Sequence, residues 1–293
     1  MTTDTYHDAM RSILPERPED GHKGTFGHVL ILATSRGFTG TAGLTAEAAG
    51  RSGAGLVTVA IPETLLDIVA SMLWESMSLP LPATEAGSID REALKPALAA
   101  AETRDAVVLG PGVSTHEETR QFVAAFVRDC PIPMVIDADG LNCVSREVAL
   151  LKQCKSLVIL TPHPGEMARL AACSTSDVQA DRERIARRFA GEHGCVVVLK
   201  GKGTVIAAPD GACCINPTGN SGLATGGTGD VLAGFTGGLL AQGMKPYDAA
   251  RLGAYMMGLA GDIAARKFTQ RGMIARDVIE CIPDAWRELE GVK

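Results

Sequence analysis

Aromatic residues, excess positive charge and long apolar runs are all scarce in this sequence. Aromatic residues make up 4% of its 293 residues although 46% are hydrophobic, so a core must be built mainly from Val, Ile, Leu and Ala. The formal net charge of -6 argues against nucleic acid as a partner. No stretch is apolar for long enough to cross a bilayer, and residues 1–10 lack the apolar centre of a signal peptide. We therefore expect a soluble, cytoplasmic protein that binds neither nucleic acid nor membrane.

Zinc-type cysteine pairs are missing as well. The eight cysteines include no C-x-x-C pair, and their spacing does not suggest a zinc site. Most of them lie in apolar runs. We expect buried, reduced thiols, which are usual in cytosolic proteins.

Short apolar runs recur along the chain, with amphipathic stretches between them. The runs occupy residues 28–34, 55–62, 106–112, 133–140, 157–164 and 195–201. Because they do not alternate with polar residues, they indicate strands buried on both faces. The stretches 115–129 and 177–194 are helical in pattern, and in the second Asp177 should cap the start and Gly194 the end. The alternation predicts an α/β fold with a mostly parallel central sheet and helices on both faces.

The pattern changes after residue 195. Residues 196–219 are typical of a strand, a Gly-rich turn, a second strand and a short third strand, which predicts an antiparallel edge to the sheet. Helices should follow at 230–242, 246–268 and 274–289, with a break or kink at Pro283. No linker or internal repeat is present, so we expect a single domain over residues 1–293.

Glycine-rich segments follow several of the predicted strands, where ligands of open parallel sheets bind. Gly37, Gly40 and Gly43 follow the first strand with the spacing G-x-x-G-x-x-G. Glu63, after the second strand, is placed where a dinucleotide-binding fold has an acidic residue for the ribose. The turn of such a fold needs G-x-G, however, so dinucleotide binding is disfavoured here. The helix start at residues 40–43 could meet another ligand or form a plain tight turn. The segment LGPGVS, residues 109–114, is by itself a weak signal, because Pro-Gly is common in turns.

Acidic and imidazole side chains follow the next two strands. Asp137 and Asp139 should project the same way while the chain stays extended, and could hold a metal ion or cap the next helix, with capping favoured for Asp139. His163 lies between two prolines that restrict its backbone, which suits a ligand contact. Glu166 in the first turn of a helix either complements the helix dipole or faces a magnesium ion.

Two segments point to phosphate. In KGKGT, Lys200 to Thr204, glycines expose backbone N–H groups beside two lysines, although the same pattern suits a plain basic hairpin turn. In residues 220–234, a glycine-rich loop leads into a helix near Asp230, whose first N–H groups are unpaired.

The glycines of the second segment, Gly226, Gly227 and Gly229, let the backbone approach an anion, and the Thr228 hydroxyl could donate to it. This predicts an anion hole for a transferring phosphoryl group, with Asp230 as the base for an attacking hydroxyl. The helix dipole should keep Asp230 ionised. The alternative is that Asp230 merely caps the helix.

As a set, these motifs resemble those of the ADP-dependent NAD(P)H-hydrate dehydratases, which are ribokinase-like proteins. The resemblance runs from about His22 to the last helix, and it rests on LGPGVS, VIDADGLN, LTPHPGEMARL, LKGKGT and GNSGLATGGTGDVLAG. It implies a ribokinase-like three-layer sandwich. It also implies repair of the (6S)-hydrate of NADH or NADPH, with ADP as phosphoryl donor and Mg²⁺ as cofactor, giving AMP and phosphate. A homotetramer without the fused epimerase domain of some relatives is implied too, acting alongside a separate NAD(P)H-hydrate epimerase.

The resemblance assigns roles residue by residue. The hydrate would be bound by Ala42, Gly112, His163 and Asp230. The adenine nucleotide would be bound by Lys200, Gly201, Lys202, Gly203, Thr204 and Gly229. Catalysis would fall to Asp230 with the anion hole of Gly227, Thr228 and Gly229, and the metal to Glu166. Two other functions remain open: a kinase of the same fold for a vitamin-precursor alcohol, and a catalytically idle nucleotide-binding regulator.

Overall fold

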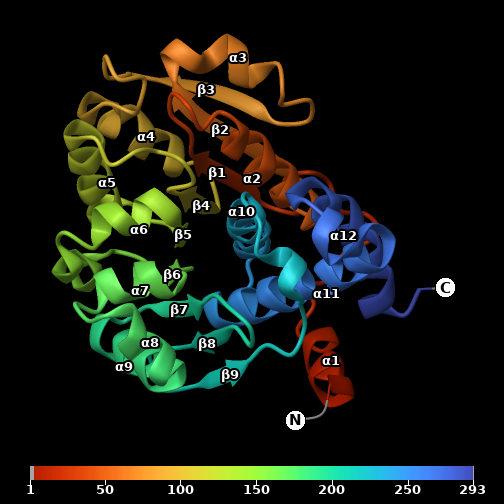
Figure 1. Ribbon diagram of the computed structural model, residues 1–293. Coiled ribbons are helices and arrows are strands. Elements are labelled where there is room, and N and C mark those ends of the chain that lie inside the picture. Colours follow the sequence, from red (N-terminus) through yellow and green to blue (C-terminus); the bar gives the residue numbers. More distant parts are fainter. Residues whose placement is uncertain (1–2, 293) are drawn as a thin grey trace.

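The computed structural model describes residues 3–292 and has three layers, with a sheet between two layers of helices (Figure 1). The part of the chain described has nine strands in one sheet, in the order β3-β2-β1-β4-β5-β6-β7-β8-β9. The strands are β1 (His28–Leu32), β2 (Leu56–Pro62), β3 (Met77–Leu81), β4 (Ala106–Leu109), β5 (Met134–Ile136), β6 (Val158–Leu160), β7 (Val196–Leu199), β8 (Val205–Ala207) and β9 (Cys213–Ile215). Neighbours from β3 to β7 pair in parallel, whereas β8 and β9 are antiparallel. The predicted mostly parallel sheet with an antiparallel edge is confirmed.

Helices cover both faces of the sheet. One face carries α2 (Gly40–Arg51), α3 (Leu66–Ala70), α10 (Thr228–Ala241), α11 (Pro246–Gly272) and α12 (Ala275–Glu290), with α1 (Thr3–Arg11) against the last two. The other face carries α4 (Leu94–Ala101), α5 (Glu117–Asp129), α6 (Ala138–Val144), α7 (Pro164–Leu170), α8 (Thr175–Ala180) and α9 (Arg182–His193). Short 3₁₀ turns are η1 (Glu63–Leu65), η2 (Arg91–Ala93), η3 (Val148–Gln153) and η4 (Ser221–Leu223).

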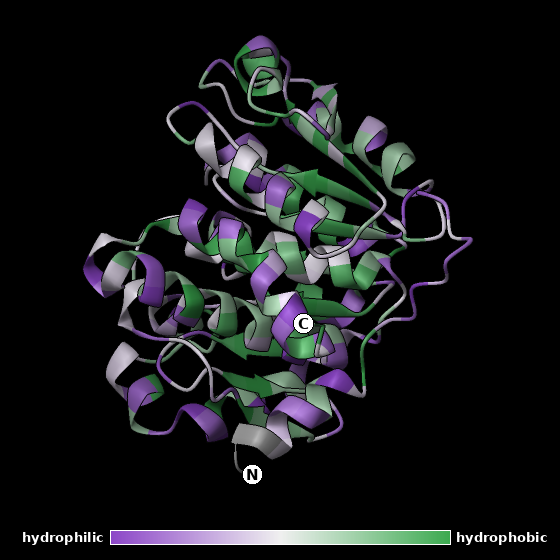
Figure 2. Cartoon of the chain, turned by 90° about the vertical axis from the view of Figure 1, so that its right-hand side faces the viewer, coloured by the Kyte–Doolittle hydropathy of each residue, from purple (hydrophilic) through white to green (hydrophobic). Residues whose placement is uncertain are grey.

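The strands have apolar side chains on both faces, which is why their sequences do not alternate. Along β1, Val29 and Ile31 belong to the core under α2 and α10, whereas Leu30 and Leu32 belong to the core under α4 and α5. Figure 2 shows these apolar strands between helices that carry hydrophilic residues on their outer sides. No helix within residues 3–292 is long and apolar enough to cross a membrane.

The local predictions were incomplete at one strand and differ from the structure in two helical segments. Strand β3 was not foreseen, because it is a partly exposed edge strand containing Pro80. Residues 177–194 form two helices, since Asp181 leaves the helical region at φ −153° and ψ 75°. Asp177 is therefore not a cap: Ser174 caps α8, Asp181 caps α9, and Asp177 accepts a hydrogen bond from the Ser174 backbone N–H. Helix α12 continues through Pro283, so the predicted interruption takes the form of a proline inside a continuous helix and not of a break.

Other local predictions hold. Gly194 ends α9 in the left-handed conformation, at φ 68°. All eight cysteines are unpaired. Four of them are buried and four are half-buried, so the expected burial is confirmed in part.

Candidate active site

The polar ends of three neighbouring strands meet at one edge of the sheet. Asp137 follows β5, Thr161 follows β6 and Lys200 follows β7, and these three strands are adjacent and parallel. Parallel strands bring their carboxyl ends to the same edge, which explains why residues 63 positions apart touch. Helix α10 packs against β4 and β5, and in Figure 1 it lies beside the middle of the sheet.

Lys200 is the centre of the polar cluster. Its Nζ donates to Asp137 Oδ1 over 2.7 Å and lies 3.9 Å from Glu166 Oε2. Thr161 Oγ1 donates to the same Asp137 oxygen, also over 2.7 Å. The side chains are 21% (Lys200), 1% (Asp137) and 6% (Glu166) exposed. Burial lowers the pKa of Lys200, but Asp137 and Glu166 outweigh that effect and the pKa is raised. Lys200 is therefore a charged side chain held inside the site.

The start of α10 lies against this cluster. Gly227 is the N-cap residue with φ 90° and ψ −17°, a left-handed conformation that favours glycine. A Cβ at Gly227 would lie 2.6 Å from Leu44 Cδ1, so side-chain packing also demands glycine. A Cβ at Gly229 would lie 3.3 Å from Lys200 Nζ and 3.4 Å from Asp137 Oδ2. The glycine-rich helix start and the Lys200 cluster therefore form one site.

Asp230 is the third residue of α10 and does not cap it. Its carboxylate accepts no hydrogen bond from the residues that the structure describes. Burial raises the pKa of Asp230 to about 7, with further raising by Asp137 and Asp139 and partial opposition from Lys200. Asp230 was expected to be ionised, and a pKa of about 7 leaves it only partly ionised at neutral pH, because burial and like charges oppose the negative charge.

His163 and Glu166 cap helix α7 together. The His163 Nδ1 accepts from the backbone N–H groups of Gly165 and Glu166, at 3.0 and 3.3 Å, and Glu166 Oε2 accepts from the His163 N–H over 2.8 Å. Burial lowers the pKa of His163 and raises that of Glu166 to about 7, while Lys200 lowers both. Since Nδ1 is an acceptor, the proton of the neutral ring is on Nε2, and half of this side chain is exposed to solvent.

Two expected contacts differ in the structure. The Thr228 hydroxyl donates to the carbonyls of Leu223 and Thr225, at 2.8 and 2.9 Å, so it holds the loop and only its backbone N–H remains for an anion. Asp137 and Asp139 do not project together, because Ala138 between them has φ 49°. Asp139 instead accepts from the Ser114 N–H and from Asn142.

The sequence pointed to Asp137 as a metal ligand or a helix cap, but not as the partner of Lys200. The sequence presents two equivalent aspartates after β5, and nothing in it reveals the positive φ of Ala138. The sequence signal that could have revealed this pairing is Lys200 in its glycine-rich turn, because a lysine that is buried in a site needs a carboxylate partner.

The two residues expected at the ends of β1 and β4 are buried. Ala42 has no exposed surface. Gly112 has φ 64°, and a Cβ there would lie 2.8 Å from Phe38 Cβ. The Ser35 hydroxyl donates to the Gly112 carbonyl over 2.7 Å. Phe38 is exposed in this corner, as is Arg36, so a ligand would meet Phe38 before Ala42 or Gly112.

The acidic side chains of the site suit a metal ion that is bound together with phosphate oxygens. Within residues 3–292, no group of three or more His, Cys, Asp or Glu side chains is arranged to hold a metal ion. Asp137 and Glu166 nevertheless lie 2.7 and 3.9 Å from the Lys200 ammonium group, whose charge also interacts with that of Asp230. Mg²⁺ usually binds through one or two carboxylates together with phosphate oxygens, and these acidic groups suit that arrangement.

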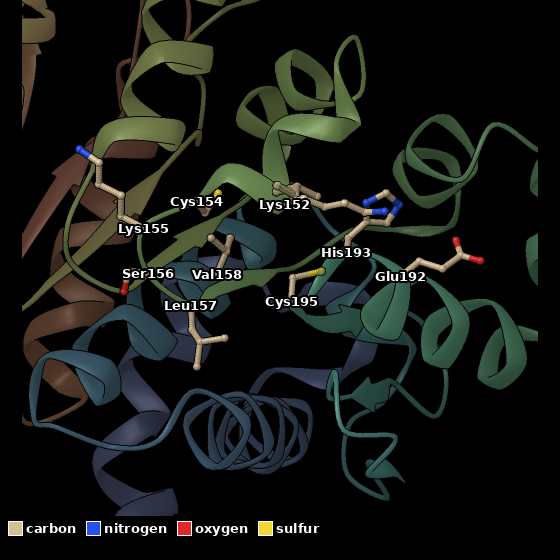
Figure 3. Close-up of a pocket in the computed structure, with 11 residues that line it drawn as sticks. Lys152, Cys154, Lys155, Ser156, Leu157, Val158, Glu192, His193 and Cys195 are labelled. Atoms are coloured by element: carbon tan, nitrogen blue, oxygen red, sulfur yellow. The ribbon is translucent and has the colours of Figure 1, made fainter.

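A hollow of about 470 Å³ lies at the opposite end of the strands (Figure 3). It is formed by residues just before β6 and β7, including Lys152, Cys154, Leu157 and His193. None of the residues expected to bind a ligand lines it. The candidate site is therefore the open cluster at the carboxyl ends of the strands.

The fold and this site define the ribokinase-like class of nucleotide-binding α/β proteins, and comparisons with known proteins narrow the class to a family. The family model for NAD(P)H-hydrate dehydratase matches residues 29–284. The chain belongs to the NAD(P)H-hydrate dehydratase family.

Two curated relatives and one solved structure illustrate the match. The bifunctional NAD(P)H-hydrate repair enzyme Nnr of Moorella thermoacetica is 46% identical over 96% of this chain, which spans 53% of that relative. The ADP-dependent (S)-NAD(P)H-hydrate dehydratase of Bacillus subtilis is 34% identical, with 96% of both chains covered. The crystal structure of the ADP/ATP-dependent dehydratase from Bacillus subtilis, co-crystallized with ATP/Mg²⁺, matches with a TM-score of 0.84 and 32% identity, covering 97% of each chain. The chain thus spans about half the length of the curated bifunctional relatives.

Proposed function

We propose that this protein catalyses the ADP-dependent dehydration of (6S)-NAD(P)H hydrate, giving NAD(P)H, AMP and phosphate. One observation carries the proposal: the glycine-rich start of α10 with Asp230 lies directly against Lys200, the first residue of the expected nucleotide turn. Family membership and the match to the Bacillus subtilis dehydratase support it.

The proposed chemistry has two stages. The hydroxyl oxygen of the hydrate attacks the β-phosphoryl group of ADP, Asp230 takes the hydroxyl proton, and AMP leaves. The phosphate then leaves the ring carbon, pushed out by the electron pair of the adjacent ring nitrogen, and a proton leaves the neighbouring carbon to form the double bond. Phosphate is a far better leaving group than hydroxide, which is why the phosphoryl donor is needed.

Each part of the site has a task in the proposal. Asp230, with a pKa of about 7, suits a base that works near neutral pH. The backbone N–H groups of Thr228 and Gly229 stabilise the transferring phosphoryl group, and Lys200 adds a positive charge beside them. In this proposal residues 200–204 bind the nucleotide and His163 binds the hydrate, whereas the buried Gly112 and Ala42 would contribute only from behind Phe38. Bound with the nucleotide, Mg²⁺ would neutralise phosphate charge, with Glu166 as the proposed protein ligand.

Further properties belong to the same proposal. We propose a single domain over residues 1–293, supported by one continuous sheet across the described residues. We also propose a cytoplasmic homotetramer that works alongside a separate NAD(P)H-hydrate epimerase. The exposed apolar side chains of Ile68, Met72, Trp74 and Met77 around edge strand β3 support a contact between subunits.

The direct test incubates the purified protein with (6S)-hydrated NADH, ADP and Mg²⁺ and follows the return of NADH absorbance. We expect absorbance to return only when ADP is present, with one AMP and one phosphate formed per NADH. A vitamin kinase of the same fold would leave the hydrate unchanged. An idle regulator would bind ADP without turnover, and either result would refute the dehydratase assignment.

A further inference from the structure

Arg182 forms hydrogen bonds to the backbone around the turn of residues 200–204. It is the first residue of α9, and its guanidinium group donates to two carbonyls of the turn region. Nη2 donates to Leu199 O and Nη1 to Lys202 O, each over 2.7 Å. One planar group thus spans the segment that contains Lys200 and Gly201.

The glycine at position 201 fits closely against this guanidinium group. Gly201 has φ 140°, which L side chains rarely adopt. A Cβ there would lie 3.0 Å from Arg182 Nη2 and 3.2 Å from its Cζ. Thr204 Oγ1 closes the turn by donating to the Gly201 carbonyl over 3.1 Å. The turn is therefore shaped from two sides, by Arg182 and by Thr204.

Arg182 differs from the other arginines of α9. Arg184, Arg187 and Arg188 form ion pairs with Asp181, Glu183 and Glu192. Arg182 forms no ion pair within residues 3–292, and its Nε is buried without a hydrogen-bond partner. Burial lowers the pKa of Arg182, and no carboxylate offsets that effect. Its guanidinium group therefore donates to backbone carbonyls and to no carboxylate. The positive charge lies beside a segment that is expected to bind phosphate.

We propose that Arg182 is a positioning residue for the nucleotide, acting through the backbone of residues 199–202 without touching the ligand. The inference rests on the proposed function, which places the adenine nucleotide on this turn. A planar guanidinium can hold two carbonyls in a fixed relation, whereas the ammonium group of lysine is a single point of charge. Arg182→Lys therefore keeps the charge but loses the fork.

The experiment compares Arg182→Lys and Arg182→Gln with Arg188→Lys, a control in an exposed arginine of the same helix. Amide hydrogen exchange of residues 199–204 is measured without ligand, the Kd for Mg·ADP by calorimetry, and KM and kcat with hydrated NADH. We expect both Arg182 variants to exchange faster at the turn and to bind ADP roughly tenfold more weakly, because the binding turn must then be ordered at the expense of binding free energy. KM for ADP should rise with little change in kcat, and the control should match the parent.

Three results would overturn the positioning role. In the first, Arg182→Lys keeps the parental exchange and ADP affinity, so that charge alone suffices. In the second, exchange rises throughout the molecule and kcat falls with the melting temperature, which indicates a general structural role. In the third, the parent neither binds ADP nor converts the hydrate. That third result refutes the proposed function itself, and exchange at the turn then reports separately whether Arg182 holds the backbone.

Discussion

At the residue scale, the carboxyl group of Asp230 is governed by two opposing influences. The amino end of α10 favours a negative charge, whereas burial and the neighbouring Asp137 and Asp139 oppose it. The outcome is a pKa of about 7, well above the ordinary 3.8 of aspartate. A group poised there can accept a proton at neutral pH and has enough basicity to assist an attacking hydroxyl.

Asp230→Asn tests this role directly. The variant keeps the shape of the side chain and loses no hydrogen bond of the described structure, so it should fold normally. We expect kcat to fall by roughly 10²–10⁴, the usual effect of losing a positioned base. ADP affinity should be unchanged or better, because a negative charge near the phosphates is gone. The measurements are turnover of hydrated NADH, melting temperature and the ADP dissociation constant; near-parental turnover would leave Asp230 without a catalytic role.

The same pKa predicts a link between pH and stability. Between the ordinary value of 3.8 and the folded value of about 7, the folded chain holds more protons at Asp230 than the unfolded chain. The free energy of unfolding should therefore fall as pH rises through this window. Asp230→Asn removes this cost of burying an ionised carboxylate, so the variant should melt above the parent near about pH 8 and at the same temperature near about pH 3. A difference in melting temperature that does not depend on pH would contradict the shift.

The two lysines of the turn should behave differently. Lys200 is held between Asp137 and Glu166, whereas Lys202 is exposed. Lys202→Ala should raise KM for ADP a few-fold and leave the melting temperature unchanged. Lys200→Ala should raise KM for ADP more strongly. It should also lower stability, since removing one partner of a buried pair costs about 3–5 kcal/mol. Equal effects of the two substitutions on ADP kinetics and on urea unfolding would contradict the placement of Lys200.

How far the sequence predicts the site depends on the residue. Composition alone marks the glycine loops and the lysines as candidate site residues, and Asp230 follows such a loop directly. The pairing of Asp137 with Lys200 cannot be read from composition, because it depends on the left-handed φ of Ala138 and on a lysine 63 positions away. Thr228 was misjudged for a related reason: its hydroxyl has carbonyl partners in a loop whose path the sequence does not reveal.

At the element scale, α10 uses glycine for two purposes. Those at its start shape the anion-binding turn, whereas later ones let the helix lie close to its neighbours. A Cβ at Gly234 would lie 2.1 Å from Thr45 O of α2, and one at Gly238 would lie 1.9 Å from Ser52 Oγ. The sequence shows this glycine content but does not say which glycines bind ligand and which serve packing.

Gly238→Ala tests the packing role. The added methyl group cannot fit without moving α10 away from α2, so the free energy of unfolding should fall by about 1–3 kcal/mol in urea titrations. Gly50→Ala is the matched control in α2, because nothing lies within 4 Å of its Cβ position. That control should be neutral, or more stable by about 0.5–1 kcal/mol. Similar losses in both variants would show that helix spacing is not the cause.

Strands and helices were predictable to the extent that burial determined them. Buried runs without alternation gave every strand from β4 to β7, because such runs suit few other structures. Edge strand β3 was not predicted, because it is short and half-exposed and because its pairing with β2 is a tertiary property. The division between α8 and α9 was not predicted, because the helical conformation is interrupted at Asp181 without a glycine or proline.

At the scale of the whole molecule, strand order creates the site. The chain visits β1, β2 and β3 on one side of the sheet before crossing to β4, and then adds β5, β6 and β7 in sequence. Asp137 and Lys200 follow β5 and β7, and Glu166 lies in α7 shortly after β6, so this order of strands brings both carboxylates to the Lys200 ammonium group. Alternating strands and helices predict a parallel sheet, but not which strands are neighbours, so the sequence could not give these contacts.

The last prediction concerns edge strand β3, at the end of the strand order away from β9. Among the described strands, β3 has β2 as its one neighbour, and Ile68, Met72, Trp74 and Met77 are exposed around it, with Trp74 88% exposed. Exposed apolar side chains on an edge strand favour association, because burying them removes apolar surface from water. If subunits of the proposed tetramer meet here, Trp74→Glu should shift the protein toward smaller species in size-exclusion chromatography with light scattering. Leu157→Glu is the control, because Leu157 is an exposed apolar residue just before the interior strand β6, and it should leave the mass unchanged. A monomeric parent at micromolar concentration would refute the oligomer, and an unchanged mass for Trp74→Glu would exclude this edge as the interface.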